Sequence, residues 1–416
     1  MKIKRFFKVL GPGVITGAAD DDPSGIVTYA IAGAKGGFNL LWMAIVTFPL
    51  MAAIQEMCAR IGMVTSSGLM GVMRRRYSKP LFFLLALLAI FANTVNIGAD
   101  LLGMASATAL LIPLSEKILA LIFVVVIVPV IVLLPYKRLA KYLKWLTLAL
   151  FAYIAAAFAS SPDWREALRA TFAPQFMFNK EIVLVMVAVL GTTISPYLFF
   201  WQASEEVEER ETKNRFRFIH RIVTKHELKE MRDDVNLGMF FSNLVMFFII
   251  VNTGAVFHSR GITELVTAGQ VASSLEPLVG GFAYLLFTVG IIGTGLLAIP
   301  VLAGSTAYVL TEAFGLTEGL NKKFHEAKIF YGTIIASTLV GFLMSFLEFG
   351  AVEILFAAAV IYGMISPPII LIIMDIANNR AIMGNKVNNW FQNFFGAAAF
   401  LVTGSAALLM LIFAFL

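Results

Sequence analysis

Residues Asp20-Asp21-Asp22-Pro23-Ser24-Gly25 interrupt the first long apolar segment of the chain, which runs from about residue 9 to residue 34. Proline removes a backbone donor and clashes with the preceding helical turn, and glycine readily adopts an unwound conformation. A carboxylate in the middle of a membrane is costly unless water or a cation accompanies it. The stretch therefore predicts a broken helix in which Asp22, the aspartate beside the break, binds a cation.

The composition places the whole chain in a membrane. Its 416 residues are 59% hydrophobic and 14% charged, whereas a soluble domain carries about 25% charged residues. A helical crossing needs roughly 20 mostly apolar residues. We predict an all-α membrane protein with eleven transmembrane helices, at residues 9–34, 40–62, 80–112, 118–135, 142–160, 181–204, 234–257, 280–311, 328–348, 351–376 and 388–415.

The basic residues predict the orientation. If the N-terminus is cytoplasmic, 26 of the 32 lysines and arginines fall on the inside and 6 on the outside. The positive-inside rule then predicts a plasma (inner) membrane protein with the N-terminus in the cytoplasm and the C-terminus outside. Basic loops beside the membrane also explain the net charge of +6 without any nucleic acid.

A second break lies in the sixth segment, at Gly191-Thr192-Thr193-Ile194-Ser195-Pro196-Tyr197. Both breaks fall in the first helix of a five-helix unit, and an odd helix number gives the two units opposite topology. We predict a single membrane domain with a first repeat at 1–160, an inverted repeat at 181–376 and an eleventh helix at 388–415. Broken helices at matching positions of inverted repeats indicate a transporter with a site at the membrane midplane.

Other charged residues lie within or beside the apolar segments, where a charge is costly unless it has a partner or a function. Glu56 and Arg60 have the spacing of a pair on one helix face, and Asp100 lies well inside the third segment. Asp20 and Asp21 are expected to shape the electrostatic approach to the site or to meet that third segment. The alternating charges of residues 205–233 predict a solvated cytoplasmic helix or loop.

Several motifs near the N-terminus resemble those of a known family. The chain resembles the Nramp-type divalent metal transporters in Gly11-Pro12-Gly13, in the Asp22-Pro23 break, and in Ala32-Gly33-Ala34 followed by Leu40-Leu41-Trp42. The resemblance implies the LeuT-like fold, a 5+5 inverted repeat with unwound helices 1 and 6, here with one extra C-terminal helix.

The departures from the family pattern concern the metal ligands. The family has Asp-Pro-Gly-Asn in helix one and Met-Pro-His in helix six, and its aspartate, asparagine and methionine bind the metal. This chain retains Asp22 but has Gly25 and Ser195 in place of the asparagine and methionine. A thioether favours soft transition ions, whereas a roomy site of oxygen atoms suits Mg²⁺, which dehydrates reluctantly. The chain thus resembles the Nramp-related magnesium transporter branch most.

The residues of the family's proton route are also largely replaced. Asn93, Gly103, Tyr197 and Gln202 stand where relatives carry acids or histidines, although Asp100 remains acidic. We predict uncoupled, facilitated uptake of hydrated Mg²⁺, and also Mn²⁺, by alternating access. The predicted ligands, together with nearby carbonyls, are Asp22, Gly25, Thr192 and Ser195.

Further polar residues are expected along the pathway or around the ion's water: Asp21, Asn93, Asn96, Asp100, Thr193 and Tyr197. Asn93 and Asn96 could equally form interhelical hydrogen bonds.

Four other functions remain open: a proton-coupled Mn²⁺/Fe²⁺ importer, an organic-substrate symporter, an intramembrane enzyme using Asp22 and Asp100, and a passive channel. We expect no cofactor besides the transported ion and no obligate protein partner. Membrane lipids are the expected surroundings. The sequence leaves open the physiological ion and the number of waters it keeps.

Overall fold

The computed structural model describes residues 11–134, 150–176, 178–213 and 223–415, and the regular elements within these ranges are helices. The longer ones are α2 (Pro12–Asp20), α3 (Pro23–Gly36), α4 (Trp42–Thr65), α5 (Leu69–Arg76), α6 (Lys79–Ala109), α7 (Glu116–Leu133), α9 (Ala152–Ala159), α10 (Trp164–Phe172), α11 (Lys180–Thr193), α12 (Pro196–Lys213), α13 (Lys225–Val256), α16 (Ala283–Phe314), α17 (Lys328–Leu343), α18 (Ala351–Asn378) and α20 (Trp390–Phe415). Short helices α14 (Ala268–Ser273), α15 (Glu276–Val279) and α19 (Arg380–Met383) lie in connections, as do 3-10 turns at Gly37–Leu40, His258–Arg260, Gly280–Phe282 and Met344–Phe346.

The predicted segments agree with these helices. Within the described ranges, nine spans are long and apolar enough to cross a membrane, counting α11 and α12 together. The broken pair α2 and α3 covers the first predicted segment. Most of the fifth, 142–160, lies outside the described residues, and α9 is its described end. The repeat boundaries at 1–160 and 181–376 remain predictions.

The charged stretch at 205–233, predicted as a solvated helix or loop, is mostly helical in its described part. Helix α12 continues to Lys213, and α13 already begins at Lys225 behind a capping box formed by Thr224 and Glu227. Glu205, Glu206 and Glu208 are buried, not solvated. The charge pattern indicates a polar stretch, but it does not show that neighbouring helices cover these three glutamates.

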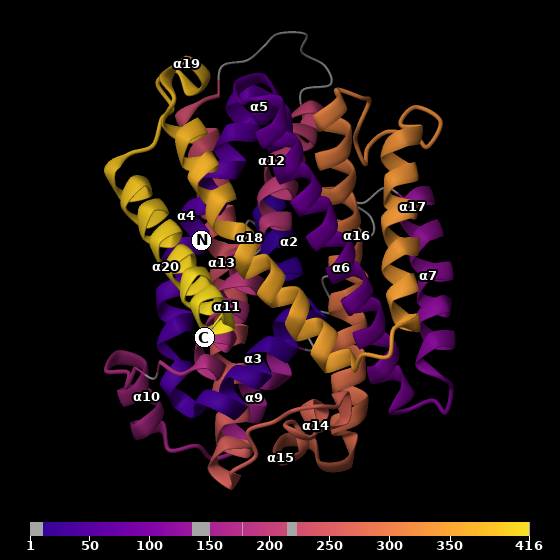
Figure 1. Cartoon of the computed structure of the whole chain (residues 1–416), viewed down its shortest axis with the longest axis vertical. Helices are drawn as coiled ribbons and strands as arrows, with labels where there is room; N and C mark the ends of the chain where they lie inside the picture. Colours follow the sequence, from indigo (N-terminus) through magenta and orange to yellow (C-terminus); the bar gives the residue numbers. More distant parts are fainter. Residues whose placement is uncertain (1–10, 135–149, 177, 214–222, 416) are drawn as a thin grey trace.

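The helices form two groups (Figure 1). Helices α2, α3, α4, α12 and α13 pack together, whereas α6, α7, α16 and α17 form the group on the right of the view. Helix α18 contacts α11, α3 and α6, and α20 packs on α18 and α4. Helices α5 and α19 lie at one end of the molecule, and α10, α14 and α15 lie at the other.

Helix α2 is held against α13 by glycines. A Cβ atom added at Gly17 would lie 2.3 Å from the carbonyl carbon of Gly238, and one added at Gly13 would lie 2.6 Å from the Val235 nitrogen. The Gly11 and Gly13 N–H groups donate to the Asp234 carboxylate at 2.9 and 2.7 Å, so α13 caps the start of α2. Small residues let two membrane helices bring their backbones into contact.

Glu56 and Arg60 share a helix face, as their spacing indicates, but they do not form a direct ion pair. The Arg60 guanidinium donates to Gln392 Oε1 at 2.6 Å and to Asn388 Oδ1, while Glu56 accepts from Arg232 at 3.1 Å. The planar guanidinium can donate to two acceptors at once, and residues next to and within α20 supply both. This network ties α4 to the start of the last helix.

Candidate metal site

The break in the first segment falls where it was predicted. Helix α2 ends at Asp20, Asp21 leaves the helical region with φ −85° and ψ 52°, and Asp22 is extended with φ −69° and ψ 171°. Helix α3 then begins at Pro23, whose missing N–H is tolerated in a first helical turn. The break thus exposes carbonyls of α2 and amides of α3 at one place.

The second break is also confirmed. Helix α11 ends at Thr193, Ile194 has φ −110° and ψ 62°, and α12 begins at Pro196. The proline again prevents the helix from continuing unchanged. Two unwound stretches, 170 residues or so apart in sequence, therefore meet in the middle of the fold.

Asp22 is the centre of the first break and is 1% exposed. Its Oδ1 accepts hydrogen bonds from the Gly25 N–H at 2.7 Å and from Ser24 Oγ at 2.8 Å. Its Oδ2 accepts from Asn96 Nδ2, on α6, at 2.7 Å. Asp22 is therefore the N-cap of α3, a position where the helix dipole and free amides stabilise a carboxylate.

Oxygen atoms from both breaks converge beside Gly25. A Cβ atom added there would lie 3.1 Å from Thr192 Oγ1, 3.2 Å from the Asp20 carbonyl oxygen and 3.4 Å from Asp22 Oδ1. A hydroxyl, a carbonyl and a carboxylate thus surround the side of Gly25 that carries no side chain. These are the hard oxygen ligands that Mg²⁺ and similar ions prefer.

Ser195 and Thr193 lie at the second break but use their hydroxyls locally. Ser195 Oγ donates back to the end of α11, with the Gly191 and Thr192 carbonyls at 2.8 and 2.5 Å. Thr193 Oγ1 donates to the Val189 carbonyl at 2.6 Å and lies 3.4 Å from the Tyr29 hydroxyl. Of the predicted ligands in this break, Thr192 therefore lies nearest Asp22, while Ser195 caps the end of α11.

A ring of polar contacts lies one turn from Asp22, towards the start of α6. Tyr362 donates to Asn93 Oδ1 at 3.0 Å, Asn93 Nδ2 donates to Ser305 Oγ at 3.4 Å, and Ser305 donates to the Tyr197 carbonyl at 2.8 Å. The Tyr197 and Tyr362 rings lie 5.5 Å apart, and Tyr197 donates to the Ala19 carbonyl at 2.8 Å. Asn93 thus forms interhelical bonds, as does Asn96.

Asp20 and Asp21 were expected to shape the electrostatic approach to the site or to meet the third segment, and their carboxylates do not meet that segment. Ser242 Oγ, on α13, donates to Asp20 Oδ2 and lies 3.3 Å from Asp21 Oδ1. Both aspartates are buried against the seventh predicted segment. Close packing of α2 on α13 turns them away from α6, so Asp20 contributes its carbonyl oxygen to the Gly25 side but not its carboxylate.

The site is closed on all sides. Asp22, Thr192, Ser195, Asn96 and Asp100 are each at most 2% exposed. Among the described residues, no three His, Cys, Asp or Glu side chains are grouped to hold a metal, so a bound ion would rely on one carboxylate together with neutral oxygens. An ion can reach or leave such a site only if helices move.

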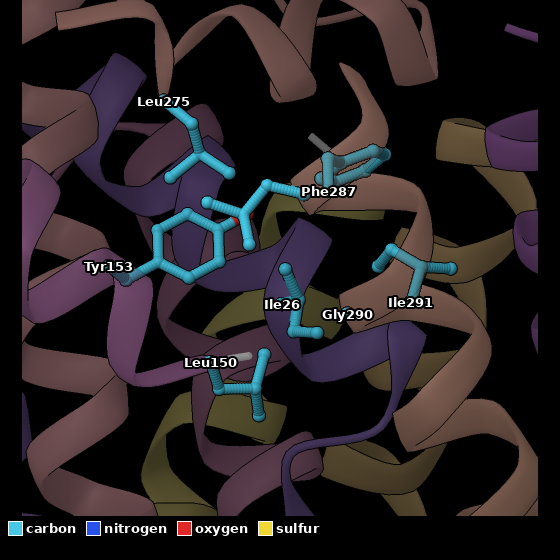
Figure 2. A pocket seen from close by; sticks show the side chains of 8 residues that line it. Ile26, Leu150, Tyr153, Leu275, Phe287, Gly290 and Ile291 are labelled. Atoms are coloured by element: carbon cyan, nitrogen blue, oxygen red, sulfur yellow. The ribbon is translucent and has the colours of Figure 1, made fainter. Parts of the chain in front are cut away.

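A small cavity beside α3 does not extend the site. It has a volume of about 10 Å³ and is lined by Ile26, Leu150, Tyr153, Leu275, Leu286, Phe287, Gly290 and Ile291 (Figure 2). Its walls are apolar apart from the tyrosine, and a buried water needs two to four polar partners. This part of the fold separates the site from the end that carries α14 and α15.

Sequence reasoning missed Ser242, Ser305 and Tyr362, which hold the residues around the breaks. Each lies in a helix remote in sequence from both breaks and in an ordinary apolar context. No local pattern distinguishes such a residue from one that faces lipid.

Comparison with known proteins gives a consistent result. The model of the family described as "Nramp: Natural resistance-associated macrophage protein-like" matches residues 13–413. The divalent metal cation transporter MntH of Bradyrhizobium diazoefficiens is 25% identical over 98% of this chain and 89% of its own length. MntH of Caldanaerobacter subterraneus is also 25% identical, over 77% of this chain and 75% of its own.

Solved structures confirm the predicted fold. A manganese transporter of Eremococcus coleocola superposes with a TM-score of 0.77 at 18% identity, covering 98% of this chain and 87% of the other. Mhp1, a nucleobase-cation-symport-1 family transporter in a closed conformation, superposes with a TM-score of 0.54 at 15% identity, covering 96% and 91%. The two unwound helices therefore belong to a LeuT-like arrangement.

Proposed function

The chain belongs to the Nramp family, and from this premise we propose that it carries hydrated Mg²⁺, and also Mn²⁺, across the membrane by alternating access. Its relatives are named as divalent metal cation transporters and not as enzymes, which sets aside an intramembrane aspartyl enzyme. Within the family, we place the chain with the Nramp-related magnesium transporter branch.

The convergence of oxygen atoms beside Gly25 carries this proposal. Thr192 Oγ1, the Asp20 carbonyl and Asp22 Oδ1 all lie within 3.4 Å of one point, the place of the missing Cβ atom. A longer side chain at residue 25 would fill that space and supply its own ligand. Glycine instead leaves room for an ion that keeps part of its water, as Mg²⁺ usually does.

The ligand at the second break supports a hard ion. Ser195 offers an oxygen where the resembled pattern has a thioether, and its hydroxyl already donates to the Thr192 carbonyl at 2.5 Å. Asp22 is the carboxylate ligand, with Thr192 and the Asp20 carbonyl beside it. Asp21, Thr193, Asn93 and Tyr197 position the two breaks without touching the ion.

The driving force requires no second ion. A membrane potential contributes about 2.3 kcal/mol per charge per 100 mV, so a divalent cation gains roughly 4–5 kcal/mol on entry. Tyr197 donates to the Ala19 carbonyl and Gln202 accepts from Thr16 at 2.6 Å. Both positions thus hold neutral, hydrogen-bonded side chains, which favours uncoupled, facilitated transport.

The closed site implies a two-sided gate. We propose that the end carrying α5 and α19 faces the cytoplasm of a plasma membrane protein, since the basic residues gather there. The ring of Tyr197, Tyr362, Asn93 and Ser305 would then close the cytoplasmic side. Movement of α2 and α12 away from α6 and α16 would break it and release the ion.

Reconstitution in liposomes tests the proposal. Purified protein should carry both Mg²⁺ and Mn²⁺, in a saturable manner that distinguishes a carrier from a pore. Robust Mn²⁺ flux without Mg²⁺ flux would refute the magnesium assignment.

A proton-coupled Mn²⁺ importer is the second candidate, because a solved structure with this fold is titled a manganese transporter and because Asp100 is buried near Asp22. A pH-sensitive dye inside the liposomes separates the two. Uncoupled transport leaves the lumen pH unchanged, whereas acidification that follows metal entry would support the coupled importer.

A further inference from the structure

One face of α6 beside Asp22 carries oxygen atoms without hydrogen-bond partners. Asn96 and Asp100 are four residues apart and therefore lie on the same side of the helix. Both are 0% exposed. Asn96 Nδ2 is fixed by its bond to Asp22 Oδ2 at 2.7 Å, yet Asn96 Oδ1 and both Asp100 carboxylate oxygens lack partners among the described residues.

These oxygens face the first turn of α3. Asp100 lies near the Asp22 carboxylate, and the Ser24 backbone amide is its nearest donor, too distant for a full hydrogen bond. Gly103, next along the same face, packs against that turn, since a Cβ atom added there would lie 3.4 Å from Pro23 Cβ. Asn96 thus lies at Oδ2 of Asp22, with Asp100 one turn further along α6, whereas Gly25 adjoins Oδ1.

A buried acceptor without a donor costs about 1–3 kcal/mol, and a charged one costs more. Water molecules around a divalent cation supply donors, and carboxylate and amide oxygens are hard-ion ligands. We infer that Asn96 and Asp100 form a second cation position, which takes a hydrated divalent cation on the α6 side of Asp22. This inference rests on the proposed transport function.

The two positions share the Asp22 carboxylate, and with one shared carboxylate to balance both charges, single occupancy is favoured. Two dications a few ångströms apart repel strongly in a buried site. The ion therefore occupies them in turn and passes from one carboxylate oxygen of Asp22 to the other.

Gly25→Ala isolates the second position. The added methyl group would sit 3.1–3.4 Å from the three oxygens on the Gly25 side and does not reach α6. Anomalous diffraction with Mn²⁺ as the probe should show a peak on the Gly25 side in the wild type and a peak beside Asn96 and Asp100 in Gly25→Ala. A folded Gly25→Ala protein with no Mn²⁺ peak on the α6 side overturns the inference.

Binding measurements give an independent test. Asn96→Ala and Asp100→Asn should each weaken Mn²⁺ binding, measured by calorimetry, by about 10–100-fold. Asp375→Asn is the matched control. Asp375 forms an ion pair with Arg76, with an N–O distance of 2.8 Å, and this pair does not contact the breaks. The Asp375→Asn variant should bind Mn²⁺ as the wild type does. If Asn96→Ala and Asp100→Asn bind normally while Asp22→Ala does not, the second position is refuted and the proposed function stands. Normal binding by Asp22→Ala would refute both.

Discussion

Asp22→Asn tests the central ligand while preserving the local structure. Asparagine is as good an N-cap as aspartate, so the bonds from Gly25 and Ser24, at 2.7 and 2.8 Å, can persist. The variant therefore removes a negative charge with little change in shape. The Asn96 amide, which donates to Oδ2, would then meet a second amide and would have to turn.

The size of the effect follows from the charges. At about 4 Å, the separation of a water-mediated contact, two unit charges attract by about 1 kcal/mol in water and about 4 kcal/mol at an effective dielectric constant of 20. For a dication these values double, to about 2 and 8 kcal/mol. Because Asp22 is 1% exposed, the value of about 2 kcal/mol for bulk water is a lower bound on the loss of binding free energy. That lower bound already corresponds to about a 30-fold loss of affinity, at 1.4 kcal/mol per tenfold.

The assay is Mg²⁺ and Mn²⁺ uptake into liposomes, with thermal unfolding to verify the fold. Asp22→Asn should have no measurable uptake. The double variant Asp22→Asn with Asn96→Asp restores a donor–acceptor pair between α3 and α6 and keeps the net charge. It should recover stability but not transport, because its carboxylate no longer adjoins Gly25. Wild-type uptake by folded Asp22→Asn would refute the role given to Asp22.

Three further outcomes are expected. Ser195→Met should shift the transport preference from Mg²⁺ towards Cd²⁺ and Mn²⁺ in competition assays, because a thioether is a soft ligand; an unchanged ion preference would contradict the ligand argument. Gly17→Ala should lower the free energy of unfolding by about 1–3 kcal/mol through overpacking, since its Cβ atom would lie 2.3 Å from Gly238. Gly332→Ala is the control, because open space surrounds Gly332, and it should leave the stability unchanged. Equal melting temperatures of the two variants would count against the close packing of α2 on α13. Burial and the nearby Glu312 raise the pKa of Glu318, between α16 and α17, to about 9. The unfolded carboxyl ionises near pH 4.5, so this group makes the protein less stable as pH rises from about 4.5 to 9, and Glu318→Gln should raise the melting temperature at pH 8 more than at pH 5; equal shifts at both pH values would refute this.

The sequence predicted both breaks because the cause of each is local. A proline with a neighbouring glycine or serine determines where a helix can continue, and Asp22-Pro23 and Ser195-Pro196 contain that information in adjacent residues. The long apolar segments could be predicted equally well, since a helix must be about 20 residues long to cross the membrane.

The errors concern which helix each side chain meets. Contact of Asp20 and Asp21 with α6 was one of two expected roles, but they contact Ser242 on α13, and Arg60 donates to Gln392 and not directly to Glu56. Spacing along a helix predicts which residues share a face, but it does not predict which neighbour covers that face. The hydroxyl of Ser195 illustrates the same limit, because carbonyls at the end of α11 accept its hydrogen bond and fix its direction.

The glycine contact between α2 and α13 has a consequence for how the protein moves. Interlocked side chains must change rotamer before two helices can separate, and each such change adds to the barrier. Gly13, Gly17 and Gly238 bring backbone surfaces together with no side chains to disengage, although Asp234 holds the start of α2 by hydrogen bonds. Helix α2 can therefore tilt against its neighbour as a rigid unit about the unwound residues Asp21 and Asp22. The proposed ligand Asp22 then lies at the hinge itself.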